Sequence, residues 1–190
     1  MPTPIRVAAV GDVHCAEPLR ERITRAFAAL AGNTDLVLLA GDLTTHGLPE
    51  QAQVFADACR GLELPIVAVL GNHDHHSGRA EEIVEVLDSA GIRVLDRSSL
   101  VLEIGQLEVG IVGVKGFVGG FGDSELPDFG EPLLRAVYAE TGAEVRALDV
   151  SAYDPVGVNQ NKMRFLEAFL ALCVLKESEA LEPAEQLDYD

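Results

Sequence analysis

The chain has 190 residues, of which 48% are hydrophobic and 24% are charged, and its formal net charge is -17. This size and composition predict one compact domain and exclude an extensively disordered protein. Because an acidic surface repels phosphate backbones, we expect no nucleic-acid partner except as a substrate.

Cysteine usage and hydropathy indicate the cellular compartment of the protein. Cys15, Cys59 and Cys173 lie far apart and form no C-x-x-C pair, which indicates reduced thiols rather than a disulfide framework or a zinc ribbon. The first residues lack the basic region and long apolar stretch of a signal peptide. No run reaches the roughly 18 uncharged apolar residues of a membrane span. We therefore expect a cytoplasmic protein with no membrane partner.

The first half of the chain repeats a strand, a loop and a helix three times. Short apolar runs are typical of buried parallel strands, and they occur at Ile5–Val10, Leu36–Ala40 and Ile66–Leu70. A polar loop containing glycine follows each run and leads into a helical pattern, at Leu19–Leu30, Pro49–Leu62 and Arg79–Ala90. Because right-handed crossovers keep successive strands parallel, the three loops should emerge at the same edge of one sheet.

The pattern changes after this repeat. Short strands are predicted at Val94–Leu95, Leu100–Ile104 and Leu107–Val112, the last two as an antiparallel hairpin. A glycine-rich segment, 113–130, precedes a predicted helix at Glu131–Leu148. The next segments are predicted to be a loop at Val150–Asn161, an apolar helix at Met163–Leu181 and an acidic end. The predicted fold class is therefore α/β, with a largely parallel sheet and a hairpin that extends toward a second sheet.

Each of the three loops carries side chains that can bind a divalent metal. The loops offer carboxylate and amide oxygens together with imidazole nitrogens, at Asp12, His14, Asp42, Asn72, His73 and Asp74. Such a mixed set suits Mn, Fe or Zn without a thiolate ligand. Asp12, Asp42 and Asn72 follow one another at equal intervals, so the same loop position should return to the same sheet edge.

Three sequence blocks carry a family resemblance. They are G-D-V-H at Gly11–His14, G-D-L-T-T-H-G at Gly41–Gly47 and G-N-H-D at Gly71–Asp74. In this order, spacing and strand context, they resemble the first three signature blocks of calcineurin-like metallophosphoesterases. The resemblance covers roughly residues 5–150 and implies a layered α/β/β/α sandwich, incomplete at its C-terminal side. It also implies hydrolysis of phosphate monoesters or diesters at a dimetal centre.

The resemblance implies a metal-binding role for four loop residues. Asp12 and His14 would hold the first metal, Asp42 would bridge both metals, and Asn72 would bind the second. The implied ions are Mn, Fe or Zn, two in complete members of the family and one in a reduced site. The implied partner is a small phosphorylated substrate.

Two further residues would act on the substrate. The resemblance implies that His73 faces the phosphate as a general acid or an electrostatic stabiliser, and that Asp74 orients His73. The chain departs from the family after these blocks. Members supply more metal-binding histidines from later blocks, including G-H-x-H, whereas His76 is the last histidine here. A truncated or frame-shifted product and a variant with a reduced site both remain open.

Purely structural alternatives exist for the loop residues. A single Asp or Asn after a strand often caps the next helix, and only the combination of three loops favours a metal site. His46, His75 and His76 are predicted to be solvated, Cys15 to be a small packed side chain, and Lys115 to be an exposed lysine.

The predicted organisation is a metallophosphoesterase-like domain at 1–150 followed by an atypical helical, acidic segment at 151–190. The leading function is that of a metal-dependent phosphoesterase, impaired by its missing later ligands. The alternative is a non-catalytic fragment or metal-binding module. A metal-dependent amidohydrolase is disfavoured because its first strand ends in H-x-H, whereas this chain has D-x-H. Sheet surface left uncovered in an incomplete sandwich could be covered by the apolar helix or by self-association.

Overall fold

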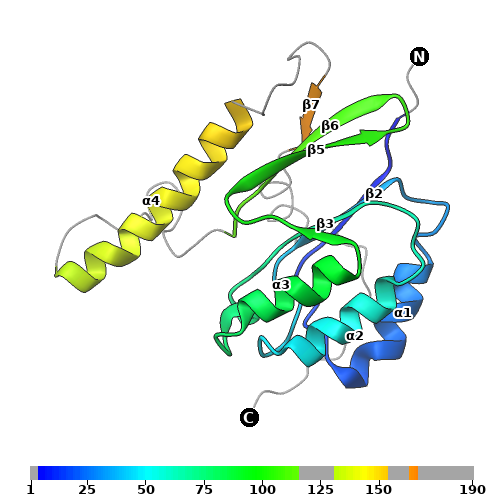
Figure 1. Ribbon diagram of the computed structural model, residues 1–190, viewed down its shortest axis with the longest axis horizontal. Coiled ribbons are helices and arrows are strands. Elements are labelled where there is room, and N and C mark those ends of the chain that lie inside the picture. The colour runs from blue at the N-terminus through cyan, green and yellow to red at the C-terminus, as the bar shows by residue number, and fades with distance from the viewer. Residues whose placement is uncertain (1–3, 116–130, 154–162, 167–190) are drawn as a thin grey trace, which may run out of the picture.

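A computed structural model describes residues 4–115, 131–153 and 163–166, and these form two stacked sheets with helices on the outside (Figure 1). The first sheet has the order β1-β2-β3-β4, and all its strands are parallel. Its strands are β1 (Val7–Val10), β2 (Leu36–Ala40), β3 (Ile66–Val69) and β4 (Ile92–Val94). The predicted three-strand unit is thus confirmed, and β4 adds a fourth parallel strand that begins two residues before the short strand predicted at Val94–Leu95.

The crossover helices lie together on one face of this sheet (Figure 1). They are α1 (Arg20–Ala28), α2 (Pro49–Cys59) and α3 (Ala80–Ser89), and a 3-10 turn, η1 (Glu17–Leu19), precedes α1. Buried aliphatic and aromatic side chains fill the space between helices and sheet, and the rings of Phe27 and Phe55 meet edge to face at 5.1 Å. All three helices were predicted, with ends within a few residues.

The second sheet has the order β5-β6-β7. Strands β5 (Ser98–Ile104) and β6 (Leu107–Gly113) form the predicted antiparallel hairpin, with Ile104 opposite Leu107. Strand β7 (Met163–Leu166) pairs in parallel with β6. The helix predicted from Met163 is therefore wrong over these four residues, because periodicity cannot distinguish a short apolar run that pairs with an open sheet edge from a buried helical segment. The rest of that predicted helix lies outside the described residues.

Helix α4 (Pro132–Tyr153) contacts the hairpin. It extends beyond the predicted end at Leu148 into a segment predicted to be a loop, because no glycine or proline interrupts the chain between Leu148 and Pro155. The guanidinium of Arg97 holds the helix to the start of β5 by ion pairs with Glu140 and with Glu144, the latter at 2.8 Å. The remaining part of the predicted loop and most of the glycine-rich segment lie outside the described residues.

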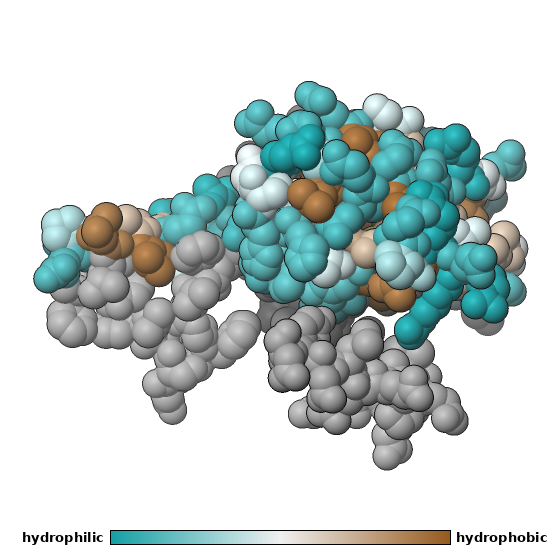
Figure 2. All heavy atoms as spheres, turned by 90° about the horizontal axis from the view of Figure 1, so that it is seen from below, coloured by the Kyte–Doolittle hydropathy of each residue, from teal (hydrophilic) through white to brown (hydrophobic). Residues whose placement is uncertain are grey.

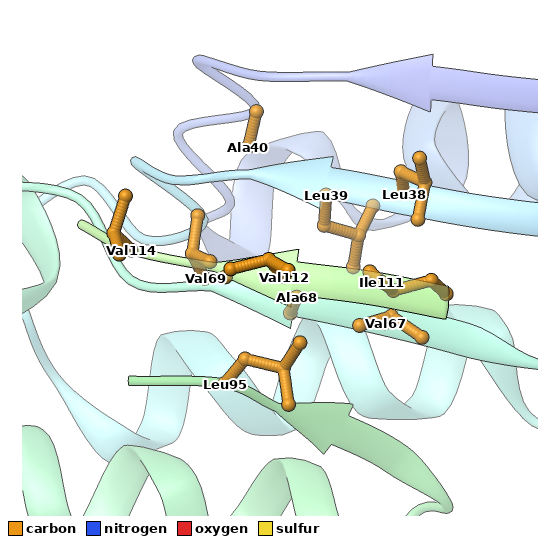
Figure 3. A pocket seen from close by; sticks show the side chains of 11 residues that line it. Leu38, Leu39, Ala40, Val67, Ala68, Val69, Leu95, Ile111, Val112 and Val114 are labelled. Carbon is orange, nitrogen blue, oxygen red and sulfur yellow. The ribbon is translucent and has the colours of Figure 1, made fainter. Parts of the chain in front are cut away.

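A second apolar cluster joins the two sheets. Its buried members come from both sheets and from the segment after β4, and they are Leu36, Leu38, Val67, Leu95, Val109 and Ile111. A cavity of about 20 Å³ remains between β2, β3 and β6 (Figure 3). It is little larger than one water molecule needs and its lining carries no polar side chain, so it is a packing gap rather than a ligand site.

The outer face of the molecule is mostly polar. Seen from below, hydrophilic side chains cover most of it, and apolar residues appear in small separate groups (Figure 2). None of the helices in the described ranges is long and apolar enough to cross a membrane. The polar loops that follow β1 and β2 lie together at one edge of the first sheet.

Candidate metal centre

Backbone hydrogen bonds join the first two polar loops beyond the ends of their strands. The N–H of Asp12 donates to Gly41 O at 3.2 Å, that of His14 to Asp42 O at 2.9 Å, and that of Cys15 to Leu43 O at 2.7 Å. The parallel pairing of β1 with β2 is therefore continued by the loops. This continuation brings the two loops to the same edge, as the repeated pattern of the sequence predicted.

Three side chains from the three loops converge at this edge. One ligand atom each from His14, Asp42 and His73 lie within 4.8 Å of one another, and all three residues are half-buried. The predicted metal ligands His14 and Asp42 supply one nitrogen and one oxygen donor. The third donor is a ring nitrogen of His73. Sequence reasoning gave His73 a role toward the substrate, although its position beside Asn72 could have indicated a ligand as well.

The imidazole of His14 supplies a test of whether this cluster fits a metal. Its Nδ1 atom is buried and has no hydrogen-bond partner in the described part of the chain. A buried polar atom without a partner is costly, and a bound cation removes that cost. Imidazole nitrogens and carboxylate oxygens are also the ligand types that Mn, Fe and Zn accept. The donor set therefore fits a divalent transition metal.

Backbone conformation singles out the same loops. Asp12, His14 and Asp42 have φ angles of 51°, 46° and 50°. A left-handed conformation costs a residue with a side chain about 1–2 kcal/mol, and such residues concentrate at functional sites. Among the described residues only one other non-glycine residue, Arg97, has a positive φ. Three of the four predicted metal ligands are thus held in a strained backbone by their loops.

The other two predicted ligands, Asp12 and Asn72, lie in the same loops, and Asp12 lies outside the three-residue cluster. Asp12 is exposed, and Asn72 is exposed at the N-terminal end of the 3-10 turn η2 (His73–His75). Asn72 makes no side-chain capping bond there. The N-cap positions of α1, α2 and α3 are occupied by Leu19, Leu48 and Arg79, so the structure does not support the capping alternative for the aspartates.

Asp74 is fully buried beneath the site. Its carboxylate accepts bonds from the backbone N–H of Leu43, of Thr44 and of Gly71 and from the Thr44 hydroxyl, at 2.7 to 3.1 Å. It therefore fastens the loop after β2 to the loop after β3. Close approach of these loops also requires Gly71, because a Cβ atom there would lie 2.1 Å from Asp42 Oδ1.

The orientation of His73 comes from other groups than the one predicted. Its Nδ1 lies 2.9 Å from the carbonyl oxygen of Thr45, and its backbone N–H donates to Asp42 Oδ1 at 3.0 Å. Its ring also meets the ring of His14 edge to face at 4.4 Å. Asp74, predicted to orient His73, positions the loop backbone instead, because its carboxylate faces the buried N–H groups. Thr45 is the orienting residue that the sequence analysis missed, since a main-chain acceptor leaves no mark in side-chain identity.

Most of the remaining residues near the site match the structural alternatives, but Lys115, predicted to be exposed, does not. His46, His75 and His76 are exposed. Cys15 is fully buried in the core, and burial raises the pKa of its thiol to about 12, so it is a packed side chain. Lys115 is half-buried at the end of the described segment after β6.

Comparison with known proteins decides the family. A family model described as calcineurin-like phosphoesterase matches residues 5–145. The chain belongs to this family. The two-sheet fold and the three sequence blocks that follow β1, β2 and β3 agree with this membership. A second family model, described as glutamate-cysteine ligase, matches residues 138–190.

Curated relatives match a short part of this phosphoesterase-family chain. The glutamate–cysteine ligases of Alcanivorax borkumensis and Saccharophagus degradans are each 48% identical to it over 42 residues, which is 22% of this chain and 8% of the relative. The chain thus spans less than a tenth of the length of these relatives.

Solved structures resemble the fold over a longer range. The phosphopantetheinyl hydrolase of Mycobacterium tuberculosis superimposes with a TM-score of 0.50 at 13% identity, covering 85% of this chain and 67% of that chain. A hypothetical protein from Thermus thermophilus has a TM-score of 0.47 at 22% identity, covering 80% of this chain and 54% of its own. At 13% identity the likeness to the phosphopantetheinyl hydrolase concerns the fold alone.

Proposed function

We propose that this chain is a metal-dependent hydrolase of phosphate monoesters or diesters. Membership of the calcineurin-like phosphoesterase family supports the reaction class. The observation that carries the proposal is the convergence of His14, Asp42 and His73, together with the buried Nδ1 of His14, which has no hydrogen-bond partner in the described part of the chain. This arrangement is suited to a cation that a phosphate ester then approaches from the exposed side of the loops.

The metal would be held by Asp12, His14, Asp42 and Asn72. When bound, a divalent ion such as Mn supplies positive charge that stabilises the phosphoryl oxygens of the substrate in the transition state. The Asp42 carboxylate also accepts a hydrogen bond from the backbone N–H of His73. It would therefore connect the bound ion to the loop after β3. The strained backbones of His14 and Asp42 hold two of these side chains close together before the ion arrives.

His73 would move a proton at the leaving group. Its Nδ1 is held at the Thr45 carbonyl, which leaves Nε2 as the ring nitrogen that can exchange a proton with the leaving oxygen. Asp74 contributes indirectly, because it fixes the backbone from which His73 extends. The proposed substrate is a small phosphorylated molecule, since the described site is a loop edge rather than a basic surface for a long polyanion.

A second candidate function is a metal-binding module without turnover. The observation that favours it is that all five histidines occur no later than His76, whereas complete family members add imidazoles from later blocks. The glutamate-cysteine ligase match over 138–190 further indicates that this part of the sequence resembles a different family from the phosphoesterase part. We propose accordingly that the phosphoesterase unit spans 1–150 and that 151–190 is a separate segment.

Metal binding and hydrolysis distinguish the two candidates. Calorimetry with Mn should show binding to the wild type that is lost in Asp42→Ala and retained in Asp88→Ala, a matched change at an exposed carboxylate of α3. Hydrolysis of an activated aryl phosphodiester should require added Mn and should fall by about 10²-fold or more in His73→Ala. Mn binding without any turnover favours the binding module. Turnover that persists in Asp42→Ala and in a chelator would show that the proposed centre is not responsible.

A further inference from the structure

The ring of His76 lies against the ring of His73. Their centroids are 4.4 Å apart and their planes are inclined by 40°. His14 contacts His73 at the same centroid distance, with planes at 89°. His73 therefore contacts two imidazoles, one from the loop after β1 and one from its own loop. Sequence reasoning assigned His76 only to solvent, and the residue is indeed exposed.

The local backbone holds position 76 in this place. The N–H of His76 donates to the carbonyl oxygen of His73 at 3.2 Å, which closes the turn of η2. The next residue anchors the turn, because the hydroxyl of Ser77 donates to the carbonyl oxygen of Gly47. A Cβ at Gly47 would lie 2.9 Å from the carbonyl oxygens of His73 and Asp74, so this anchor packs tightly against the turn. The contact between the two rings thus depends on a turn that hydrogen bonds and packing hold in place, and not on the His76 side chain alone.

We propose that His76 is a positioning residue for His73 in phosphoester hydrolysis. Thr45 fixes one ring nitrogen of His73, but a single hydrogen bond still allows the ring to tilt about it. Contacts with both His76 and His14 restrict that tilt and keep Nε2 directed at the leaving group. This inference rests on the function proposed above, and it deepens the description of the same site.

Three variants separate packing from chemistry. His76→Ala removes the ring, His76→Phe keeps an aromatic ring without nitrogen atoms, and His75→Ala removes a neighbouring exposed imidazole that makes none of the ring contacts found among the described residues. In the Mn-dependent assay, His76→Ala should lower kcat about tenfold with little change in KM, a part of the 10²–10⁴-fold that proton transfer contributes. His76→Phe should recover most of this loss, and His75→Ala should match the wild type.

A nuclear magnetic resonance measurement tests the contact independently of turnover. In the metal-free protein at pH 8, ring nitrogen spectra should show His73 mainly as the Nδ1–H tautomer, bonded to Thr45. This tautomer should become less populated in His76→Ala and should be kept in His76→Phe and His75→Ala. Unchanged His73 signals in His76→Ala would overturn the proposal, as would a loss of activity in His76→Ala that His76→Phe does not restore. If the spectra respond as expected but even the wild type shows no Mn-dependent turnover, His76 still positions the His73 ring and the proposed function fails. If the wild type turns over and His76→Ala keeps its full rate, the positioning role in hydrolysis is wrong.

Discussion

Thr44 contacts the Asp74 carboxylate through two of its own groups: its backbone N–H and its hydroxyl both donate to Oδ1 at 2.7 Å. Both residues are fully buried. The pair connects the loop after β2 with the loop after β3, and so it sets the spacing of Asp42 and His73 above it. Loop geometry at the candidate metal centre therefore depends on a carboxylate that does not face the substrate.

Replacing Asp74 by Asn should destabilise the fold. The amide keeps only one acceptor oxygen and directs an NH₂ group toward N–H donors, so the free energy of unfolding should fall by about 3 kcal/mol. Thr44→Val, which replaces the hydroxyl by a methyl group, loses its bonds with Asp74 and with the backbone N–H of Gly47 and should cost about 2 kcal/mol. Urea unfolding followed by circular dichroism measures both. Equal midpoints for Asp74→Asn and the wild type would contradict the anchoring role.

Gly71→Ala should weaken metal binding together with stability. The added methyl would lie 2.1 Å from Asp42 Oδ1 and 2.3 Å from Asp42 N, so the two loops must separate. Overpacking of this kind costs about 1–3 kcal/mol, and here it displaces a proposed ligand as well. Calorimetry with Mn at a temperature where the variant is folded should show weaker binding.

The control for this change is Gly78→Ala. Gly78 has a positive φ, of 71°, but a Cβ there meets nothing within 4 Å. Its variant should lose about 1 kcal/mol of stability from the backbone strain and should bind Mn as the wild type does. Equal Mn affinities in both alanine variants would mean that the spacing of the two loops does not govern the site.

Asp35 should titrate well below the ordinary range of a carboxyl. Hydrogen bonds from the side chain and the backbone N–H of Arg6 lower the pKa of Asp35 from 3.8 to about 2. The folded-state pKa is depressed, so the pair stabilises the fold above pH 3.8, and this contribution is lost as the pH falls toward 2. Carboxyl carbon resonances should report a midpoint near 2, and Arg6→Gln should move it back toward 3.8. A midpoint unaffected by Arg6→Gln would remove the assigned cause.

The thiols of Cys15 and Cys59 should be inert in the folded protein. Both are buried, and desolvation raises the pKa of each to about 12, so neither provides the thiolate that alkylating reagents attack. In a Cys173→Ser background, iodoacetamide at pH 8 should modify neither thiol until urea unfolds the chain. Rapid modification of either one under native conditions would show that the core around β1 and α2 opens readily.

The local sequence pattern was sufficient to predict most of the described fold. Buried apolar runs, glycine-containing loops and amphipathic stretches predicted β1, β2, β3, the three crossover helices and the hairpin, because each depends on residues close together in the chain. Parallel crossovers then placed the loops at one edge. The pattern failed at Met163–Leu166, where pairing with β6, far away in sequence, determines the conformation.

Within the candidate site, the sequence determined which side chains are available and near which edge they lie. Only the tertiary structure decided how they are arranged. It assigned the orientation of His73 to the carbonyl of Thr45, it buried Asp74 as an anchor for two loops, and it placed the ring of His76 against His73. The Thr45 acceptor and the burial of Asp74 arise where separate loops meet, and the contact between His73 and His76 arises from the turn of η2. Residue identities along the sequence therefore do not reveal these arrangements.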